Sequence, residues 1–170
     1  SKLLDVLDNN KLLNDNKFFI KIKKNIPQKA GLGGGSMNSA NILNFLEKKK
    51  FININHKQKI KILNLVGSDV VLGIESKSSV IDSKGNIKRF SNCPKFYTLL
   101  AKPEFGCSTK TIYSKVKKFN KLKYNKPKKF MFSKNYLSNQ ENDLEKIVFS
   151  NYPKLKNLKN FLLENDDLSF

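Results

Sequence analysis

The chain contains few of the residues that build metal sites and disulfide frameworks. It has one histidine, His56, and two cysteines, Cys93 and Cys107, among 170 residues. The cysteines form neither a CxxC pair nor a metal-binding spacing, so free thiols in a reducing, cytoplasmic setting are the simplest interpretation. His56 lies in a polar stretch before a predicted helix, and we expect it to be structural or exposed to solvent. Cys107 is expected to pack rather than to react.

Arginine is almost absent, although the chain is strongly basic. Arg89 is the single arginine, the formal net charge is +19, and lysines are spread over the whole sequence. Arginine is the residue that forks onto guanine and stacks on bases, so its scarcity argues against a dedicated nucleic-acid surface. We interpret the charge as solvated lysines on ordinary surfaces, and a lysine-rich RNA-binding module is the alternative.

Long apolar runs are absent too, and no apolar stretch is long enough to span a membrane. A hydrophobic content of 39% with 13 phenylalanines indicates a globular chain with a buried core. The hydrophobic periodicity predicts helices over residues 2–14, 37–50, 56–66, 109–119, 142–152 and 154–164, extended segments over 17–24, 70–74 and 95–102, and a hairpin from 79–81 and 87–90. Residues 121–134 are predicted to form a loop, and a domain boundary is expected near Cys93 and Pro94.

Glycines concentrate in one place, between a strand-like segment and a predicted helix. Four of the eight glycines lie at positions 31 and 33–35. Glycine lets backbone amides approach an anion that a β-carbon would hold away, and a helix start adds unpaired N–H groups and a positive dipole end. The run therefore predicts a phosphate cradle, in which Ser36 and Asn38 donate hydrogen bonds or cap the helix.

Two common phosphate-binding signatures do not fit this run. A Walker A loop needs Lys-Ser/Thr directly after its second glycine, whereas Gly35 is followed by Ser36 and Met37. A dinucleotide fingerprint needs a glycine in the sixth place, where the run that starts at Gly31 has Ser36. The predicted phosphate loop therefore matches neither of these two signatures.

Residues 26–40 resemble the ATP loop of the GHMP kinase superfamily, Pro-x-x-x-Gly-Leu-Gly-Ser-Ser. They follow the Gly-Gly-Gly version of the branch that acts on 4-diphosphocytidyl-2-C-methyl-D-erythritol. Three later stretches resemble motifs of the same branch and occur in the same order. Residues 67–70 resemble its Gly-Ser/Ala-Asp-Val motif, residues 102–110 resemble its Lys-Pro-x-x-Gly-Val-Ser-Thr segment, and residues 142–145 resemble its Asn-Asp-Leu-Glu helix start. Met37 stands where this branch has serine, Ser39 where it has alanine and Val71 where it has proline.

The resemblance implies both a fold and a site. The implied fold is α+β with the two-domain GHMP kinase architecture, a ribosomal protein S5 domain 2-like first half and a ferredoxin-like second half. Residues 1–93 would form the rest of the N-terminal domain, and residues 94–170 the beginning of the C-terminal domain. The implied nucleotide site comprises Pro27, Gln28, Lys29, Ala30, Gly31, Leu32, Gly33, Gly34, Gly35, Ser36, Met37 and Asn38.

Asp69 is the catalytic candidate. The matching aspartate of the family lies by the substrate hydroxyl as base or orienting group, and phosphoryl transfer depends chiefly on positioning. Taken alone, the residues around Asp69 also fit a cap or turn aspartate, which is the competing interpretation. The implied reaction moves the γ-phosphate of ATP, with Mg²⁺ expected, to the 2-hydroxyl of the methylerythritol substrate in the non-mevalonate isoprenoid pathway. Another GHMP kinase, for homoserine or mevalonate, is the alternative within the family.

Two groups in the second half have a structural and a functional interpretation. Asp143 and Glu145 are expected to complement a helix dipole, and a role on the substrate side is the alternative. Phe130, Phe132 and Tyr136 are expected to pack, and stacking on a base is the alternative.

Some family segments have no counterpart in the chain. These are the N-terminal strand with a lysine near the reacting groups, a Gly-Tyr-His segment and the third, glycine-serine motif. We therefore expect a piece of a longer enzyme, truncated at both ends and without turnover by itself. Its expected partner is the cytidine diphosphate-linked small molecule, with neither a membrane nor nucleic acid involved.

Overall fold

The computed structural model describes residues 1–27, 30–82, 84–117 and 126–165. It contains both helices and strands, with two compact units that we describe separately. The first unit comprises Ser1–Ile26 and Leu32–Ser76, and the second comprises Pro27–Gly31 and Lys77–Phe170. In the described ranges no helix combines the length and the apolar character needed to cross a membrane.

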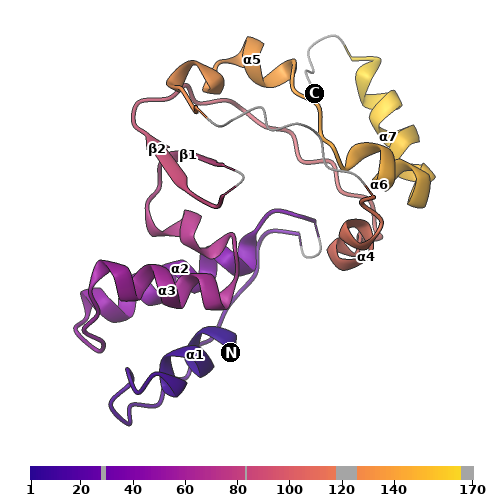
Figure 1. Ribbon diagram of the computed structural model, residues 1–170. Helices are drawn as coiled ribbons and strands as arrows, with labels where there is room; N and C mark the ends of the chain where they lie inside the picture. Colours follow the sequence, from indigo (N-terminus) through magenta and orange to yellow (C-terminus); the bar gives the residue numbers. More distant parts are fainter. Residues whose placement is uncertain (28–29, 83, 118–125, 166–170) are drawn as a thin grey trace. The chain divides into compact units, whose positions relative to one another are not determined.

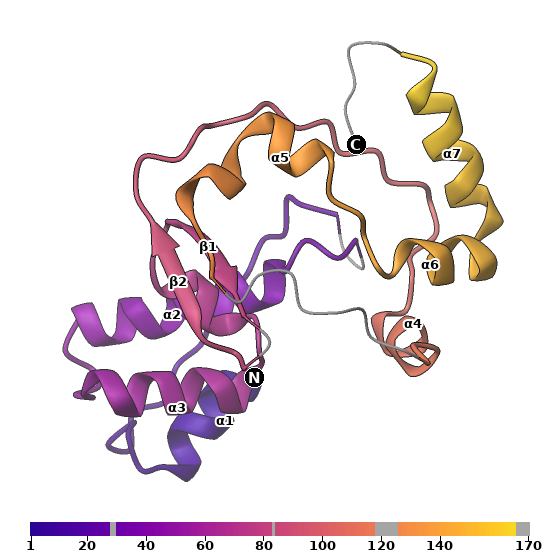
Figure 2. The same ribbon diagram turned by 45° about the horizontal axis from the view of Figure 1, so that its top comes forward.

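The first unit is helical. It consists of α1 (Lys2–Asn9), α2 (Gly34–Lys48), α3 (His56–Val66) and the short 3₁₀ helix η1 (Val70–Ile74). Helices α2 and α3 lie side by side in both views (Figures 1 and 2). An ion pair joins them, with Nζ of Lys59 2.5 Å from Oε2 of Glu47.

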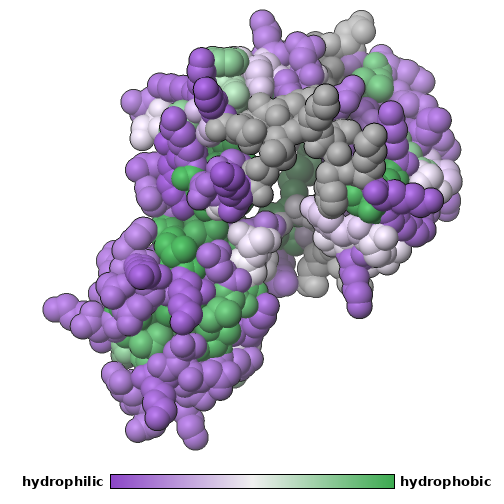
Figure 3. Space-filling model, viewed as in Figure 1, coloured by the Kyte–Doolittle hydropathy of each residue, from purple (hydrophilic) through white to green (hydrophobic). Residues whose placement is uncertain are grey.

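The buried core of the described chain lies almost entirely in this first unit. Its members are Leu3, Leu7, Leu13, Ala40, Leu43, Leu46, Ile52, Ile54, Ile62, Leu63, Val70 and Val71, whereas Ile112 is the buried apolar residue recorded for the described part of the second unit. Burial of a leucine-sized side chain contributes about 1.5–3 kcal/mol, so these contacts dominate the stability of the first unit. Apolar side chains also reach its surface, as the green areas among purple ones show (Figure 3).

Local sequence signals explain where the helices of this unit begin and end. Asn55 and Gln58 form a capping box at the start of α3, and Gly67 follows its last residue, so the predicted helix over residues 56–66 is confirmed at both ends. The predicted helix over 37–50 is confirmed as α2, which begins three residues earlier because Gly33 caps it in the left-handed conformation. Helix α1 covers the first part of the predicted segment 2–14.

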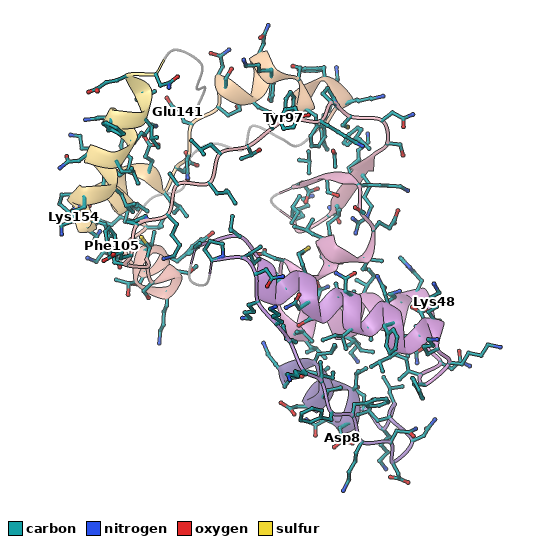
Figure 4. The ribbon with its side chains drawn as sticks, turned by 180° about the vertical axis from the view of Figure 1, so that it is seen from behind. Asp8, Lys48, Tyr97, Phe105, Glu141 and Lys154 are labelled. Carbon is teal, nitrogen blue, oxygen red and sulfur yellow. The ribbon has the colours of Figure 1, made fainter. Side chains whose placement is uncertain are left out.

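The predictions of three extended segments are wrong. Residues 17–24 and 95–102 are irregular, and residues 70–74 form η1. A strand needs a neighbour to satisfy its backbone, and in the described chain no strand pairs with either of the first two segments. Phe18 packs instead edge-on against Phe51, at 5.3 Å between ring centroids. Residues 95–102 are exposed throughout, including Tyr97 (Figure 4).

The predicted hairpin is confirmed in the second unit. Strands β1 (Ser78–Ile81) and β2 (Ile87–Phe90) pair antiparallel, with Ser78 opposite Phe90 and Ile81 opposite Ile87. The carboxylate of Asp82 accepts hydrogen bonds from the N–H groups of Lys84 and Asn86 at 2.9 and 2.8 Å, which ties the connection between the strands.

The described part of the second unit also contains five helices: α4 (Thr109–Ser114), η2 (Lys129–Phe132), α5 (Lys134–Ser138), α6 (Glu145–Asn151) and α7 (Pro153–Leu163). Ser108 caps α4 as predicted, because its side chain accepts a hydrogen bond from the N–H of Thr111, but the helix ends at Ser114. Residues 118–119 and 121–125 of the predicted helix and loop lie outside the described ranges. The two predicted C-terminal helices are confirmed as α6 and α7, with Pro153 at the first position of α7.

Candidate functional site

The glycine run forms the start of helix α2. Gly31 and Gly33 have φ values of 71° and 63°, in the left-handed region that side chains with a β-carbon rarely adopt. The carbonyl of Gly33 accepts the first intrahelical bond, from the N–H of Met37 at 2.9 Å. No side chain of the described residues caps this helix end. The N–H groups of residues 34–36 therefore point out of the helix without an intrahelical acceptor, as an anion requires.

The outer side of the glycine run is open. A β-carbon at Gly31, Gly33 or Gly35 would find nothing within 4 Å among the described residues. Gly34 differs, because a β-carbon there would lie 2.6 Å from Cδ1 of Ile26. The run thus rests on Ile26 at Gly34 and leaves Gly35 open to a ligand.

The polar side chains of the first turns of α2 divide into two groups. Ser39 donates to the carbonyl of Gly35 at 3.1 Å, and Asn41 donates to the carbonyl of Met37 at 2.9 Å. No hydrogen bond to another described residue involves the side chain of Ser36 or Asn38. Capping by these two side chains is therefore not observed, and both remain available as donors to a ligand.

Of the remaining residues of the predicted nucleotide site, those that the structure describes have no buried side chain. Pro27 and Leu32 are exposed, and Ala30 is half-buried. Gln28 and Lys29 lie outside the described residues. Pro27 to Gly31 group with the second unit, whereas Leu32 and the following residues group with the first.

Asp69 lies directly before η1 and is exposed. It occupies the N-cap position, yet its carboxylate accepts no hydrogen bond from the helix. The hydroxyl of Ser68 donates to Oδ1 of Asp69 at 3.2 Å, and the Asp69 carbonyl accepts from the N–H of Leu72. The competing cap interpretation therefore holds for its position but not for its side chain, which faces solvent and is free to meet a substrate.

Helix η1 packs against α2, so Asp69 and the part of the predicted nucleotide site from Leu32 onward belong to one unit. A β-carbon at Gly73 would lie 2.6 Å from Cβ of Ala40 and 3.2 Å from Sδ of Met37. Met37 is thus a packing residue between the start of α2 and η1. Sequence reasoning missed Gly73, although a single glycine inside an apolar run is a signal of close backbone approach.

Other candidates show structural rather than chemical roles. His56 is exposed at the first position of α3, as expected. The expected packing of the aromatic residues is confirmed, because Phe130 packs edge-on against Tyr136 at 5.3 Å and Phe132 contacts Phe90 at 5.5 Å. Within the described ranges no group of three or more acidic, cysteine or histidine side chains is arranged to hold a metal ion.

Two segments of the second unit that carry family-like motifs lie together. The hydroxyl of Tyr152, which follows α6, accepts a hydrogen bond from the N–H of Ser108 at 3.3 Å. Its ring stacks on Phe105 with 6.0 Å between centroids (Phe105 is labelled in Figure 4). At the other end of α6, Glu145 pairs with Lys159 of α7 at 2.6 Å.

Comparison with known proteins matches both the motifs and their order. Residues 2–82 match the profile of the GHMP kinases N terminal domain. The chain is 55% identical over 162 residues to 4-diphosphocytidyl-2-C-methyl-D-erythritol kinase of Pelagibacter ubique. The aligned residues cover 95% of this chain and 58% of that protein. The enzyme of the same name from Clostridium tetani is 34% identical, over 88% of this chain and 56% of that protein. The one from Fusobacterium nucleatum is 37% identical, over 84% of this chain and 51% of that protein.

The chain thus spans a little more than half the length of the curated relatives that it matches. No solved structure matches it. The profile match covers α1, the glycine run and Asp69, so it includes both predicted parts of the site. Residues 2–82 are therefore similar to the N-terminal domain of GHMP kinases, and most of the chain is similar to the curated kinases named above.

Proposed function

We propose that the full-length protein transfers the γ-phosphate of ATP to the 2-hydroxyl of 4-diphosphocytidyl-2-C-methyl-D-erythritol. The observation that carries this proposal is the uncapped glycine start of α2, in a chain whose relatives are named as kinases of that substrate. The proposed nucleotide site comprises residues 27–38. The proposed domains are residues 1–93 and 94–170, in the two-domain GHMP kinase architecture.

The phosphates of ATP fit the glycine run for a steric and an electrostatic reason. The open space beside Gly31, Gly33 and Gly35 admits an anion to the main chain, and the free N–H groups at the helix start donate to it. Ser36 and Asn38 supply two further donors with no competing partner in the described chain. Charge-assisted hydrogen bonds of this kind are about twice as strong as neutral ones.

Asp69 is the proposed group that meets the acceptor alcohol. Its exposed carboxylate accepts from Ser68 and from no backbone N–H of η1, so it retains acceptor capacity for a substrate hydroxyl. Phosphoryl transfer passes through a loose transition state, so orientation of the hydroxyl contributes more than early proton removal. Magnesium would enter on the phosphate oxygens with most of its waters, and we assign no residue as its ligand.

Two other functions predict different behaviour. Another GHMP kinase, for homoserine or mevalonate, would share the glycine run, but the names of the relatives favour the methylerythritol substrate. A lysine-rich RNA-binding module would bind RNA with a steep salt dependence and would not depend on Gly35 or Asp69. A cytoplasmic enzyme with a small-molecule substrate is the proposal that the similarity to these kinases supports.

The substitution Gly35→Ala tests the nucleotide site without damage to the fold. Gly35 has ordinary φ, and a β-carbon there meets no described atom, so the variant should be as stable as the wild type or more stable. We expect ATP affinity to fall about tenfold or more, because the methyl group stands where phosphate must approach the main chain. Calorimetric titration with ATP measures the affinity of both proteins, and the matched control is Asn64→Ala on the exposed face of α3. Unchanged ATP affinity in a folded Gly35→Ala protein contradicts the site.

The substitution Asp69→Asn tests the catalytic role. We expect turnover to be lost and ATP binding to be retained, with Asp8→Asn, an exposed carboxylate on α1, as the control (Figure 4). Turnover is measured in the full-length protein with the methylerythritol substrate, homoserine and mevalonate in parallel. Preference for either of the last two alcohols supports the family alternative, and salt-dependent RNA binding without turnover supports the RNA-binding alternative.

A further inference from the structure

Helices η1 and α2 pack tightly at Gly73, where a β-carbon would meet side-chain atoms of α2. We propose that Gly73 and Asn44 are positioning residues, which hold η1 against α2 and thereby hold Asp69 in place for the phosphoryl transfer. This inference rests on the proposed function, because it gives Asp69 the role argued above. All residues involved belong to the first unit.

Position 73 requires glycine because there is no space for a β-carbon, and not because of its backbone conformation. Its φ does not lie in the left-handed region, so an alanine there would carry no backbone strain. A β-carbon would nevertheless lie 2.6 Å from Cβ of Ala40, with Sδ and Cε of Met37 at 3.2 and 3.4 Å. Cβ of Ala40 is fixed to the α2 backbone and cannot rotate away, so alanine at position 73 must push η1 off the helix.

Asn44 holds the end of η1 from the same helix. Its amide Nδ2 donates to the carbonyl of Ile74 at 3.1 Å, in a half-buried position. Met37, Ala40 and Asn44 are spaced by three and four residues, so they form one stripe along α2. The stripe contacts Gly73 and Ile74 at the far end of η1, four and five residues after Asp69.

The near end of η1 is anchored in the core. Val70 and Val71 are 2% and 7% exposed, and η1 also contacts α3. Asp69 directly precedes this buried pair, so its main chain moves with η1 as a rigid piece. The family motif has proline at position 71, which would stiffen the same segment through its fixed φ. In this chain Val71 is buried instead, and contacts at both ends of η1 supply the rigidity.

The consequence for catalysis is a matter of distance. A reacting group misplaced by 1 Å costs on the order of 100-fold in rate, so a small shift of η1 lowers kcat. Binding of ATP at the start of α2 depends on main-chain groups of α2 itself. A shift of η1 should therefore lower kcat and leave KM for ATP nearly unchanged.

The first test exchanges glycine and alanine between the two facing positions in the full-length protein. Gly73→Ala should lower kcat by about tenfold or more, with KM for ATP within about twofold of wild type. The double variant Gly73→Ala/Ala40→Gly removes the atom that the new methyl group would meet and should recover most of the lost kcat. A folded Gly73→Ala protein with wild-type kcat overturns the proposal, and so does a kcat loss that Ala40→Gly does not relieve.

The second test needs no change in packing and covers the case in which Gly73→Ala fails to fold. Asn44→Ala removes the bond to Ile74, whereas Asn41→Ala removes a bond of the same type within α2. We expect a lower kcat for Asn44→Ala, KM for ATP unchanged, and wild-type kinetics for Asn41→Ala. Equal kinetics of the two variants overturn the proposal.

The Asp69→Asn protein, assayed in parallel, separates failure of this inference from failure of the proposed function. If Asp69→Asn loses turnover while the position 73 and 44 variants keep it, the positioning role alone is wrong. If Asp69→Asn retains turnover, the catalytic role of Asp69 is wrong, and the positioning role falls with it.

Discussion

Cδ1 of Ile26 lies over Gly34, only 2.6 Å from the point that a β-carbon on Gly34 would occupy. The same distance separates a β-carbon at Gly73 from Cβ of Ala40. The two contacts differ in what must move, because the first involves the end of a rotatable, half-exposed side chain and the second an atom fixed to a helix backbone.

Gly34→Ala should therefore be tolerated and Gly73→Ala should not. We expect the free energy of unfolding to change by less than about 1 kcal/mol for Gly34→Ala, since the helix gains an alanine and Ile26 rotates away. Gly73→Ala should lose about 1–3 kcal/mol through overpacking. Urea denaturation of the two full-length variants measures both values. Equal losses in the two variants would mean that Ile26 is held as firmly as Ala40.

Gly33 should respond to side-chain shape, because it caps α2 at φ 63° in open space. Gly33→Asn should retain more stability than Gly33→Val by about 1 kcal/mol, because asparagine visits the left-handed region and β-branched residues avoid it. The midpoints of thermal unfolding of the two variants are compared directly. The reverse order would show that the strain assigned to this position is absent.

The cap of α3 should contribute measurably to the free energy of unfolding. Asn55→Ala removes the acceptor for the N–H of Gln58, which is bonded at 2.9 Å, and should cost about 1 kcal/mol. Asn55→Asp keeps an acceptor at the same place and should cost less. Urea denaturation checks the order, with Asn53→Ala, an exposed residue before the cap, as the control. A neutral Asn55→Ala would contradict the capping box.

The hairpin should weaken in acid through Asp82. Hydrogen bonds from the Asn86 side chain, the chief cause, and from the N–H groups of Asn86 and Lys84 hold the pKa of this carboxyl below its ordinary value of 3.8. Because the folded pKa lies below the unfolded one, the stabilisation is present above about pH 4 and is lost as the pH falls through the folded pKa.

Amide hydrogen exchange at Asn86, measured from pH 5 downward and corrected for intrinsic rates, checks this pH dependence. Protection should fall in the wild type and should be independent of pH in Asp82→Asn, because the asparagine amide keeps an acceptor oxygen and does not titrate. Asp8→Asn, a change of the same charge on α1, should behave as the wild type. Protection that stays constant in the wild type would rule out the role of the carboxylate.

Local signals in the sequence were sufficient for several elements. Helix α3 was predicted over its full length from its periodicity, and its capping box and Gly67 are the local reasons why it begins and ends there. The hairpin was predicted because Asp82 and Gly85 mark a turn between two short strands. A helix start next to the glycine run was also predicted, although α2 begins three residues earlier than expected, because a glycine run followed by a helical pattern is a local signal.

The strand predictions failed because a strand depends on residues far along the chain. Alternation in residues 17–24 indicates a half-buried strand, but in the described chain no strand pairs with this segment. The apolar run over residues 70–74 fits a strand or a short helix equally well by pattern. The segment forms the 3₁₀ helix η1 because Val70 and Val71 pack into the helical core.

For the proposed site, the sequence by itself predicted a phosphate-binding helix start after the glycine run and, through motif order, the resemblance to GHMP kinases with Asp69 as the catalytic candidate. Only the tertiary structure decided what holds the segment that carries Asp69: Ala40 and Asn44 of α2, far from it in sequence, which meet Gly73 and Ile74 of η1. The physical reason is that a helix cap is specified by its own dihedral angles, whereas a close contact between two elements exists only after both have packed.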